Sequence, residues 1–78
     1  MADIKFLDVV KWQKPMEEVE RRDIMVVEDV DKDFLKVRHL SKNDNSKVAQ
    51  VVARDVRVVG HCSATEPIEN IINRYLYV

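Results

Sequence analysis

Residues 23–40, DIMVVEDVDKDFLKVRHL, decide the fold class of this chain. Residues 23–30 predict a strand with hydrophobic side chains on both faces, Ile24 and Val26 on one and Met25 and Val27 on the other, and residues 34–40 predict a second strand by the same two-residue period. Between the two runs, Asp31 and Lys32 are suited to a tight turn, so the stretch predicts a β-hairpin. One face of the second strand carries Phe34, Lys36, Arg38 and Leu40, and the opposite face carries Leu35, Val37 and His39.

The segments on either side of this hairpin extend the pattern. Six polar residues at 41–46 predict a hairpin loop, and residues 47–53 and 56–60 predict two further strands. Arg54 and Asp55 between them predict a tight turn or a single 3₁₀ step. Residues 3–12 fit either a strand or a helix, and the β-branched pair Val9–Val10 favours a strand. Residues 15–21 predict a short helix, because a proline opens the segment and acidic side chains follow it.

The C-terminal segment, residues 65–76, predicts an amphipathic helix. Its apolar side chains recur at the helical period, with polar Asn70 and Asn73 on the opposite face. Thr65 is suited to the N-cap and Pro67 to the first turn. A helix this short needs a surface to pack against, either the sheet or another chain. The apolar stripe comprises Ile68, Ile71, Ile72, Tyr75 and Leu76.

Together these elements predict one domain over residues 1–78 that is mainly β (α+β), with a sheet core over about 23–60. The 14 valines favour strands. We expect a small, strongly bent antiparallel sheet or a partly open SH3-like barrel, closed by the C-terminal amphipathic helix. The strand pattern between Asp23 and Gly60 resembles SH3-like barrels in architecture alone, without a diagnostic residue. An α+β sheet with helices on one face is the alternative.

Composition excludes several classes of protein. Gly60 is the only glycine, so a P-loop or a Rossmann phosphate loop is excluded. Cys62 is the only cysteine, which rules out an internal disulfide and favours a reducing compartment. No apolar run has the length of a signal peptide core or of a membrane span. We therefore expect a cytoplasmic protein that does not act in a membrane.

Charge is distributed unevenly along the chain. Residues 1–33 carry ten acidic and six basic side chains, whereas residues 34–62 carry six basic and two acidic ones. If the later strands pair with residues 34–40, four cations converge beside an aromatic ring, as phosphate binding and base stacking require. The alternative is a solvated face whose cations balance the charge of the acidic N-terminal third, residues 1–33, of the same molecule. The predicted partner-binding residues are Phe34, Lys36, Arg38, Arg54 and Arg57.

Other residues that could carry chemistry fit a structural role better. His39, His61 and Cys62 lack the spacing of a zinc site, so we predict no metal and no cofactor. Cys62 lies just before the N-terminus of the predicted helix, which would stabilise a thiolate, so a thiol enzyme is kept as an alternative. The acidic groups at 17–23 and 28–33 lack the ligand alternation of a calcium loop. Trp12 is expected in the core.

By elimination, the sequence predicts a small non-enzymatic interaction module that binds another macromolecule, in the first place a protein. Nucleic-acid binding through the basic strand face of Lys36, Arg38, Arg54 and Arg57 is the first alternative. An accessory or inhibitory protein of a virus or mobile element is the second, suggested by small size and the lack of a familiar motif. We expect a monomer, or a homodimer formed through the C-terminal helix.

Overall fold

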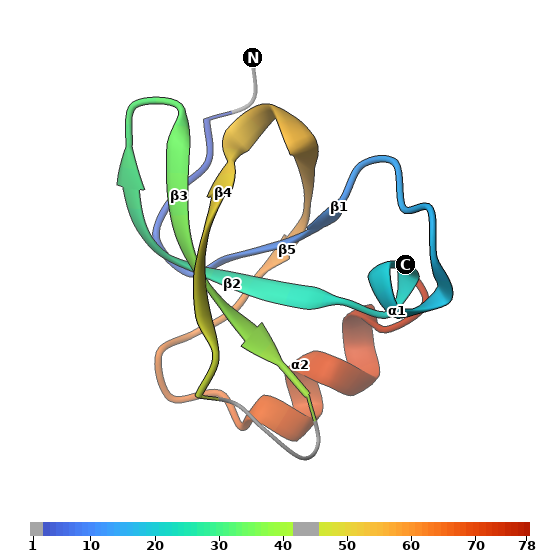
Figure 1. Ribbon diagram of the computed structural model, residues 1–78. Coiled ribbons are helices and arrows are strands. Elements are labelled where there is room, and N and C mark those ends of the chain that lie inside the picture. The colour runs from blue at the N-terminus through green and yellow to red at the C-terminus, as the bar shows by residue number, and fades with distance from the viewer. Residues whose placement is uncertain (1–2, 42–45) are drawn as a thin grey trace.

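A computed structural model describes residues 3–41 and 46–78 (Figure 1). The predicted loop at 41–46 falls mostly on residues 42–45, which lie outside the described residues. The other predicted strands and helices are present. The strand predicted within residues 3–12 begins only at residue 8, and the helices predicted at 15–21 and 65–76 each begin three residues later, whereas the other strands keep their bounds to within one residue. In chain order the elements are β1 (Asp8–Trp12), α1 (Glu18–Arg21), β2 (Ile24–Asp31), β3 (Phe34–Leu40), β4 (Val48–Val52), the 3₁₀ turn η1 (Ala53–Asp55), β5 (Val56–His61) and α2 (Ile68–Tyr75).

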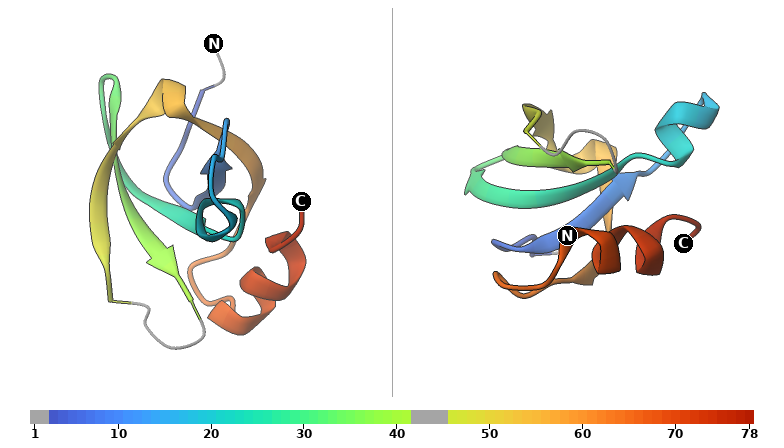
Figure 2. Two further views of the ribbon diagram at one scale, coloured as in Figure 1. Left: turned by 45° about the vertical axis from the view of Figure 1, so that its right-hand side comes forward. Right: turned by 90° about the horizontal axis from the view of Figure 1, so that it is seen from below.

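The five strands form one antiparallel sheet in the order β4-β3-β2-β1-β5. The sheet bends strongly, and η1 carries the chain from the β4 edge to the β5 edge (Figures 1 and 2). The predicted fold class is thus confirmed: the protein is mainly β, with an amphipathic helix after the sheet. The bend stops short of a closed barrel, because β4 and β5 are not neighbours in the sheet.

The hairpin predicted from residues 23–40 is confirmed as β2 and β3, with the turn shifted by one residue. Asp31 pairs with Phe34, so the two-residue loop consists of Lys32 and Asp33 rather than Asp31 and Lys32. Lys32 has a positive φ of 54°. A positive φ at the first central position belongs to the type II′ turn, which suits the twist of two antiparallel strands.

The bent sheet buries apolar side chains on both of its faces. On the inner face, all five strands contribute to one cluster, which Trp12 and Ala53 border. Strand β1 serves both faces, since Val9 and Val10 point in opposite directions and each is fully buried. Burial on both faces explains why the sequence of this segment lacks the alternation of a half-exposed strand. The inner cluster comprises Val10, Met25, Val27, Leu35, Val37, Val51 and Val56.

Helix α2 covers the outer face of the sheet. Ile71, Ile72 and Tyr75 pack with Val9 and the side chains of neighbouring strands into a second cluster. Asn70 and Asn73 are exposed, as predicted. None of the helices over 3–41 and 46–78 combines the length and apolar character that crossing a membrane demands. The outer cluster comprises Val9, Ile24, Val26, Leu40, Cys62, Ile71, Ile72 and Tyr75.

Two predictions about α2 need correction. The helix begins at Ile68 with Pro67 at the N-cap, and no side chain makes a capping hydrogen bond there, so Thr65 is not the cap. Ile68 was expected in the core, yet 37% of its surface is exposed. Because the helix starts three residues later than predicted, Ile68 occupies its first turn, at the edge of the contact with the sheet.

Gly60 explains how closely α2 approaches the sheet. A side chain built on Gly60 would overlap the ring and hydroxyl of Tyr75. The glycine therefore gives the tyrosine a flat backbone surface to lie on, in strand β5.

Candidate functional site

The predicted partner-binding residues fall into two groups in the structure. Phe34, Lys36 and Arg38 lie on one face of β3, as their alternation predicted. Arg54 lies in η1 and Arg57 in β5. Strands β2 and β1 separate β3 from β5, so the strand pairing that would bring the four cations together is absent. Sequence alone did not reveal that β5 crosses to the far edge.

The β3 group lies beside acidic residues rather than on a basic surface. Lys36 is paired in register with Asp29, and Arg38 Nη2 lies 3.3 Å from Glu28 Oε2. Both carboxylates belong to β2, which comes from the acidic third of the chain. A shallow hollow of about 400 Å³ runs across this region, and its charged lining is Asp29, Asp31 and Lys36. The strand order therefore places these two cations beside carboxylates of the same molecule.

Arg54 belongs to a different surface, beside Trp12. A hollow of about 430 Å³ lies between η1 and the connection from β1 to β2. Trp12 and Glu20 also line a second hollow of about 370 Å³, which extends past α1 to Tyr77 and includes Arg57. We call the two adjoining hollows the Trp12 cleft. Its lining residues are Lys11, Trp12, Gln13, Lys14, Pro15, Glu18, Glu20, Arg21, Arg22, Arg54, Asp55, Arg57, Leu76, Tyr77 and Val78.

One hydrogen bond holds the indole at the centre of the cleft, and a second holds the carboxylate that accepts it. Trp12 Nε1 donates to Asp23 Oδ2 at 2.8 Å, and His39 Nδ1 donates to the other oxygen of Asp23, also at 2.8 Å. Trp12 packs against the inner core cluster, as expected, but is only partly buried and lines both hollows. The sequence contained no signal for this second role, because Asp23 and His39 reach Trp12 only through strand pairing.

The cleft has more available cations than available carboxylates. Lys14, Arg21 and Arg54 are exposed and make no ion pair with any residue that the structure describes. The facing carboxylates of α1 are already engaged. Glu18 pairs with Arg22 at 3.1 Å, and Glu20 Oε1 accepts the backbone N–H groups of residues 16 and 17 at 3.0 and 3.1 Å. Within residues 3–41 and 46–78, the three cations are thus left without a counterion.

Lys11 holds the end of α2 at one side of the cleft. Its buried ammonium donates to the carbonyl oxygens of Tyr75, Leu76 and Val78 at 3.2, 2.8 and 3.3 Å. A cation at this position also suits the negative end of the helix dipole. Burial lowers the pKa of Lys11, and the nearby Arg57 guanidinium lowers it further. Arg57 Nη2 donates to the Val78 oxygen at 3.0 Å, so both cations are committed to the chain itself.

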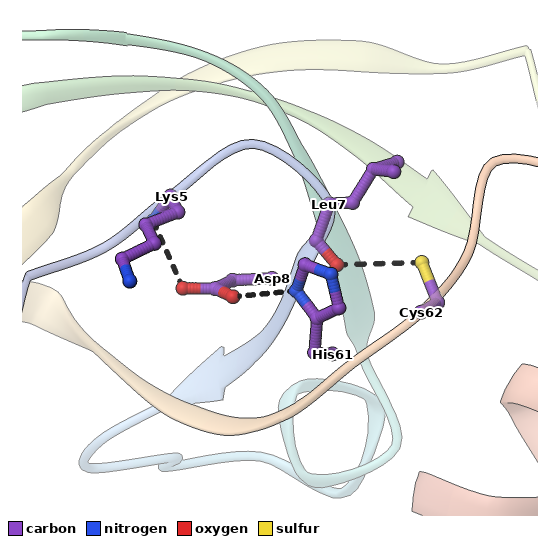
Figure 3. A network of polar contacts seen from close by, with 5 residues as sticks. All are labelled: Lys5, Leu7, Asp8, His61 and Cys62. Atoms are coloured by element: carbon purple, nitrogen blue, oxygen red, sulfur yellow. Dashed lines mark hydrogen bonds and ion pairs between the residues drawn. The ribbon is translucent and has the colours of Figure 1, made fainter.

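A second polar network joins the start of β1 to the end of β5 (Figure 3). Asp8 Oδ1 accepts a hydrogen bond from His61 Nδ1 at 2.9 Å, and Asp8 Oδ2 accepts the Lys5 backbone N–H at 2.9 Å. A buried carboxylate that orients an exposed imidazole is an arrangement found in general bases. In this protein Asp8 and His61 are partners in the pairing of β1 with β5, and their hydrogen bond links the two strands.

Cys62 is not placed to react with that imidazole. Its sulfur donates to the Leu7 carbonyl oxygen at 3.4 Å, and the thiol is buried in the outer cluster (Figure 3). Burial raises the pKa of Cys62, and the negative charge of Glu66 raises it further. A reactive cysteine needs the opposite shift. Across residues 3–41 and 46–78, no three histidine, cysteine or carboxylate side chains gather as a metal site would require.

The network of Figure 3 also fixes an unusual turn before β1. The Asp8 backbone N–H donates to the Lys5 oxygen at 3.1 Å, which closes a four-residue turn with Phe6 and Leu7 at its centre. Leu7 has a φ of 71°, a conformation that favours glycine at the third position of a turn. Its backbone bonds with Val27 and Cys62 maintain this conformation, at 2.8 and 3.0 Å.

Beside this turn lies a third kind of surface, an apolar hollow of about 280 Å³ between the turn, the sheet and the first turn of α2. Phe6 stands at its edge with 59% of its surface exposed. We call this feature the Phe6 hollow. It is lined by Phe6, Leu7, Val26, Glu28, Arg38, Leu40, Cys62, Ser63, Ala64, Glu66, Ile68 and Ile71.

No protein-family model, curated protein or solved structure matches this chain. Among the surfaces described above, the Trp12 cleft combines an aromatic ring, apolar side chains and unpaired cations. Aromatic and arginine side chains are the groups that contribute most to binding in protein–protein interfaces.

Proposed function

We propose that the protein is a non-enzymatic interaction module that binds a segment of another protein in the Trp12 cleft. One observation supports this proposal: Asp23 holds the only indole of the chain among three exposed cations that have no ionic partner in the part of the chain that the structure describes. An indole fixed before binding loses little side-chain entropy when a partner contacts it. The cleft therefore offers an aromatic anchor that is already in place.

The charges of the cleft indicate the chemistry of the partner segment. Lys14 and Arg54 line the hollow on the η1 side, and Arg21 lines the hollow on the α1 side. A segment lying across Trp12 would pass between these cations. We therefore expect a partner with acidic residues flanking an aromatic or aliphatic side chain that contacts the indole. Acidic residues would speed the encounter and select the partner, while the apolar contact would supply most of the affinity.

A nucleic acid is the alternative partner, because cations beside an aromatic ring also suit phosphate and base contacts. The overall charge of the chain favours a protein. The chain has a net charge of −1, whereas nucleic-acid-binding domains carry a marked basic excess.

Isotope-edited NMR of the whole chain tests the proposal. Peptides of three compositions, each with one central tryptophan, would be titrated: flanked by glutamates, by serines or by lysines. We expect the glutamate peptide to shift the indole N–H signal of Trp12 and the amide signals of residues 13–14, 16–20 and 54–55. The serine peptide should shift the same signals at higher concentration, and the lysine peptide should have the smallest effect.

Charge-reversal variants provide the matched control. Arg54→Glu should weaken binding of the glutamate peptide by about tenfold, the effect of losing one favourable charge contact and gaining a repulsive one. Lys36→Glu makes the same charge change on β3 and should leave that binding unchanged. Equal effects of both variants, or no shifts at Trp12 with any peptide, would contradict the proposal. Salt-sensitive binding of an oligonucleotide at the same residues would favour the nucleic-acid alternative.

A further inference from the structure

The turn before β1 exposes an aromatic side chain that no packing requirement of the fold explains. Leu7, at the third position of the turn, packs against the outer core cluster. Its positive φ is held by hydrogen bonds to β2 and to Cys62, and this arrangement leaves Phe6 at the tip. A bulky residue in a conformation that favours glycine is strained, and such strain is characteristic of functional segments.

The surface next to Phe6 can receive an apolar side chain. Buried Val26, Leu40 and Ile71 line the Phe6 hollow, together with Ile68, which is 37% exposed. The aromatic projection and the apolar hollow therefore lie side by side on one face of the molecule. A two-fold dimer uses the same patch on both subunits, so a patch holding both a projection and its receptacle is complementary to itself.

The charges near the hollow also fit a second copy of the chain. Arg38 and Glu28 form one ion pair at its edge, and Glu66 pairs with Arg74 at 2.9 Å on the α2 side. Glu28, Arg38 and Glu66 line the hollow, so the patch carries both signs of charge, and Arg74 adjoins it through its pair with Glu66. In a two-fold arrangement, an acidic group of one copy can face a basic group of the other, whereas a patch of one sign would repel itself.

We propose that two copies of this chain associate about a two-fold axis, with Phe6 of each copy inserted into the Phe6 hollow of the other. This surface shares no residue with the Trp12 cleft. Dimer formation would therefore leave both clefts open and would present two of them on one particle. A bivalent partner could occupy both clefts at once, and it would then bind the dimer more tightly than it binds a single cleft.

Sedimentation equilibrium tests the proposal on the full chain. The apparent mass should rise from 9.1 kDa toward twice that value as the concentration approaches about 1 mM, which detects even a weak association. Phe6→Ser and Ile68→Ser should each raise the dimer Kd by about tenfold or more. Met16→Ser removes a side chain that is 89% exposed and lines neither the hollow nor the Trp12 cleft, and it should leave the Kd unchanged.

Two further measurements connect the dimer to this surface. In a mixture of labelled and unlabelled protein, isotope-filtered NOEs should join the Phe6 ring of one copy to the Ile71 methyl groups of the other. Amide spectra of Phe6→Ser should retain the folded pattern, and this variant should still bind the glutamate peptide at Trp12. A mass of 9.1 kDa at every concentration, or an undiminished dimer in Phe6→Ser, would overturn the proposal without affecting the Trp12 cleft.

Discussion

At the tip of the β2–β3 hairpin, Lys32 adopts a backbone conformation that its side chain disfavours. Its φ of 54° lies in the left-handed region, where a residue with a Cβ is about 1–2 kcal/mol less stable than in the right-handed one. Glycine avoids this penalty and is the usual residue at the first central position of a type II′ turn. The hairpin thus forms in spite of its turn residue, through the pairing of its strands.

Replacing this lysine gives a prediction of increased stability. Lys32→Gly should raise the free energy of unfolding by about 0.5–1 kcal/mol, because relief of the φ penalty exceeds the added chain entropy of glycine. The midpoint of thermal unfolding should rise by a few degrees, which calorimetry can measure.

Asp33→Gly is the matched control, since Asp33 occupies the other loop position and has no positive φ. There glycine adds entropy to the unfolded chain without relieving strain, so the variant should be less stable than the wild type. Equal changes in the two variants would show that the conformation of Lys32 does not limit the stability of the hairpin.

Helix α2 packs on the sheet through a contact between Tyr75 and Gly60 that a single added methyl group would disturb. The Tyr75 ring lies against the backbone of Gly60, and a methyl group at residue 60 would overlap it. Gly60→Ala should lower the free energy of unfolding by about 1–3 kcal/mol, the range for inserting an extra group into a packed core. Urea denaturation measures this loss.

A double variant separates this overlap from a general effect on β5. Gly60→Ala should cost less in a Tyr75→Leu background, where the shorter side chain leaves room for the methyl group. An unchanged cost in that background would mean that the alanine acts on the strand itself and not on the packing of α2.

At the same scale, the sequence predicted the elements better than their arrangement. The alternation in residues 34–40 gave β3 with its bounds, and residues 15–21 gave α1, because both depend on local patterns. The position of β5 beside β1 depends on long-range pairing, which no local pattern encodes. The Trp12 cleft was missed for the same reason, since its two hollows are assembled from β1, α1, η1 and the C-terminal residues.

Across the whole molecule, strand order brings the acidic and basic parts of the chain together. The acidic third supplies β2, the basic segment supplies β3, and the two pair along seven residue positions. Charges that are separated in sequence therefore alternate over one sheet face. This arrangement places Lys36 and Arg38 beside carboxylates and leaves the unpaired cations of the Trp12 cleft on another part of the surface.

The stability of the whole fold should depend on pH through Cys62. Its pKa is raised in the folded state, so the folded protein holds the thiol proton more tightly than the unfolded chain does. This contribution is complete below about pH 8.5, the ordinary thiol pKa, and is lost as the pH rises through the folded-state value. Wild-type protein should therefore lose stability above that pH more steeply than Cys62→Ala.

Urea denaturation of both proteins from pH 7 to pH 10 checks this expectation. The stability advantage of the wild type over Cys62→Ala should shrink toward alkaline pH. Lys11, whose pKa is shifted by burial, titrates in both proteins, so the comparison cancels its effect. A constant difference across the range would show that the thiol titrates alike in the folded and unfolded chains.

The position of Trp12 has a practical consequence. It is the only tryptophan of the chain, it is only partly buried, and it lines both hollows of the cleft. Its fluorescence emission therefore comes from one known place, and covering the ring with a partner would remove water from it and shift the emission to shorter wavelength. The protein thus carries an intrinsic optical reporter of its own occupancy, which would reveal a ligand in unlabelled samples at concentrations far below those of NMR.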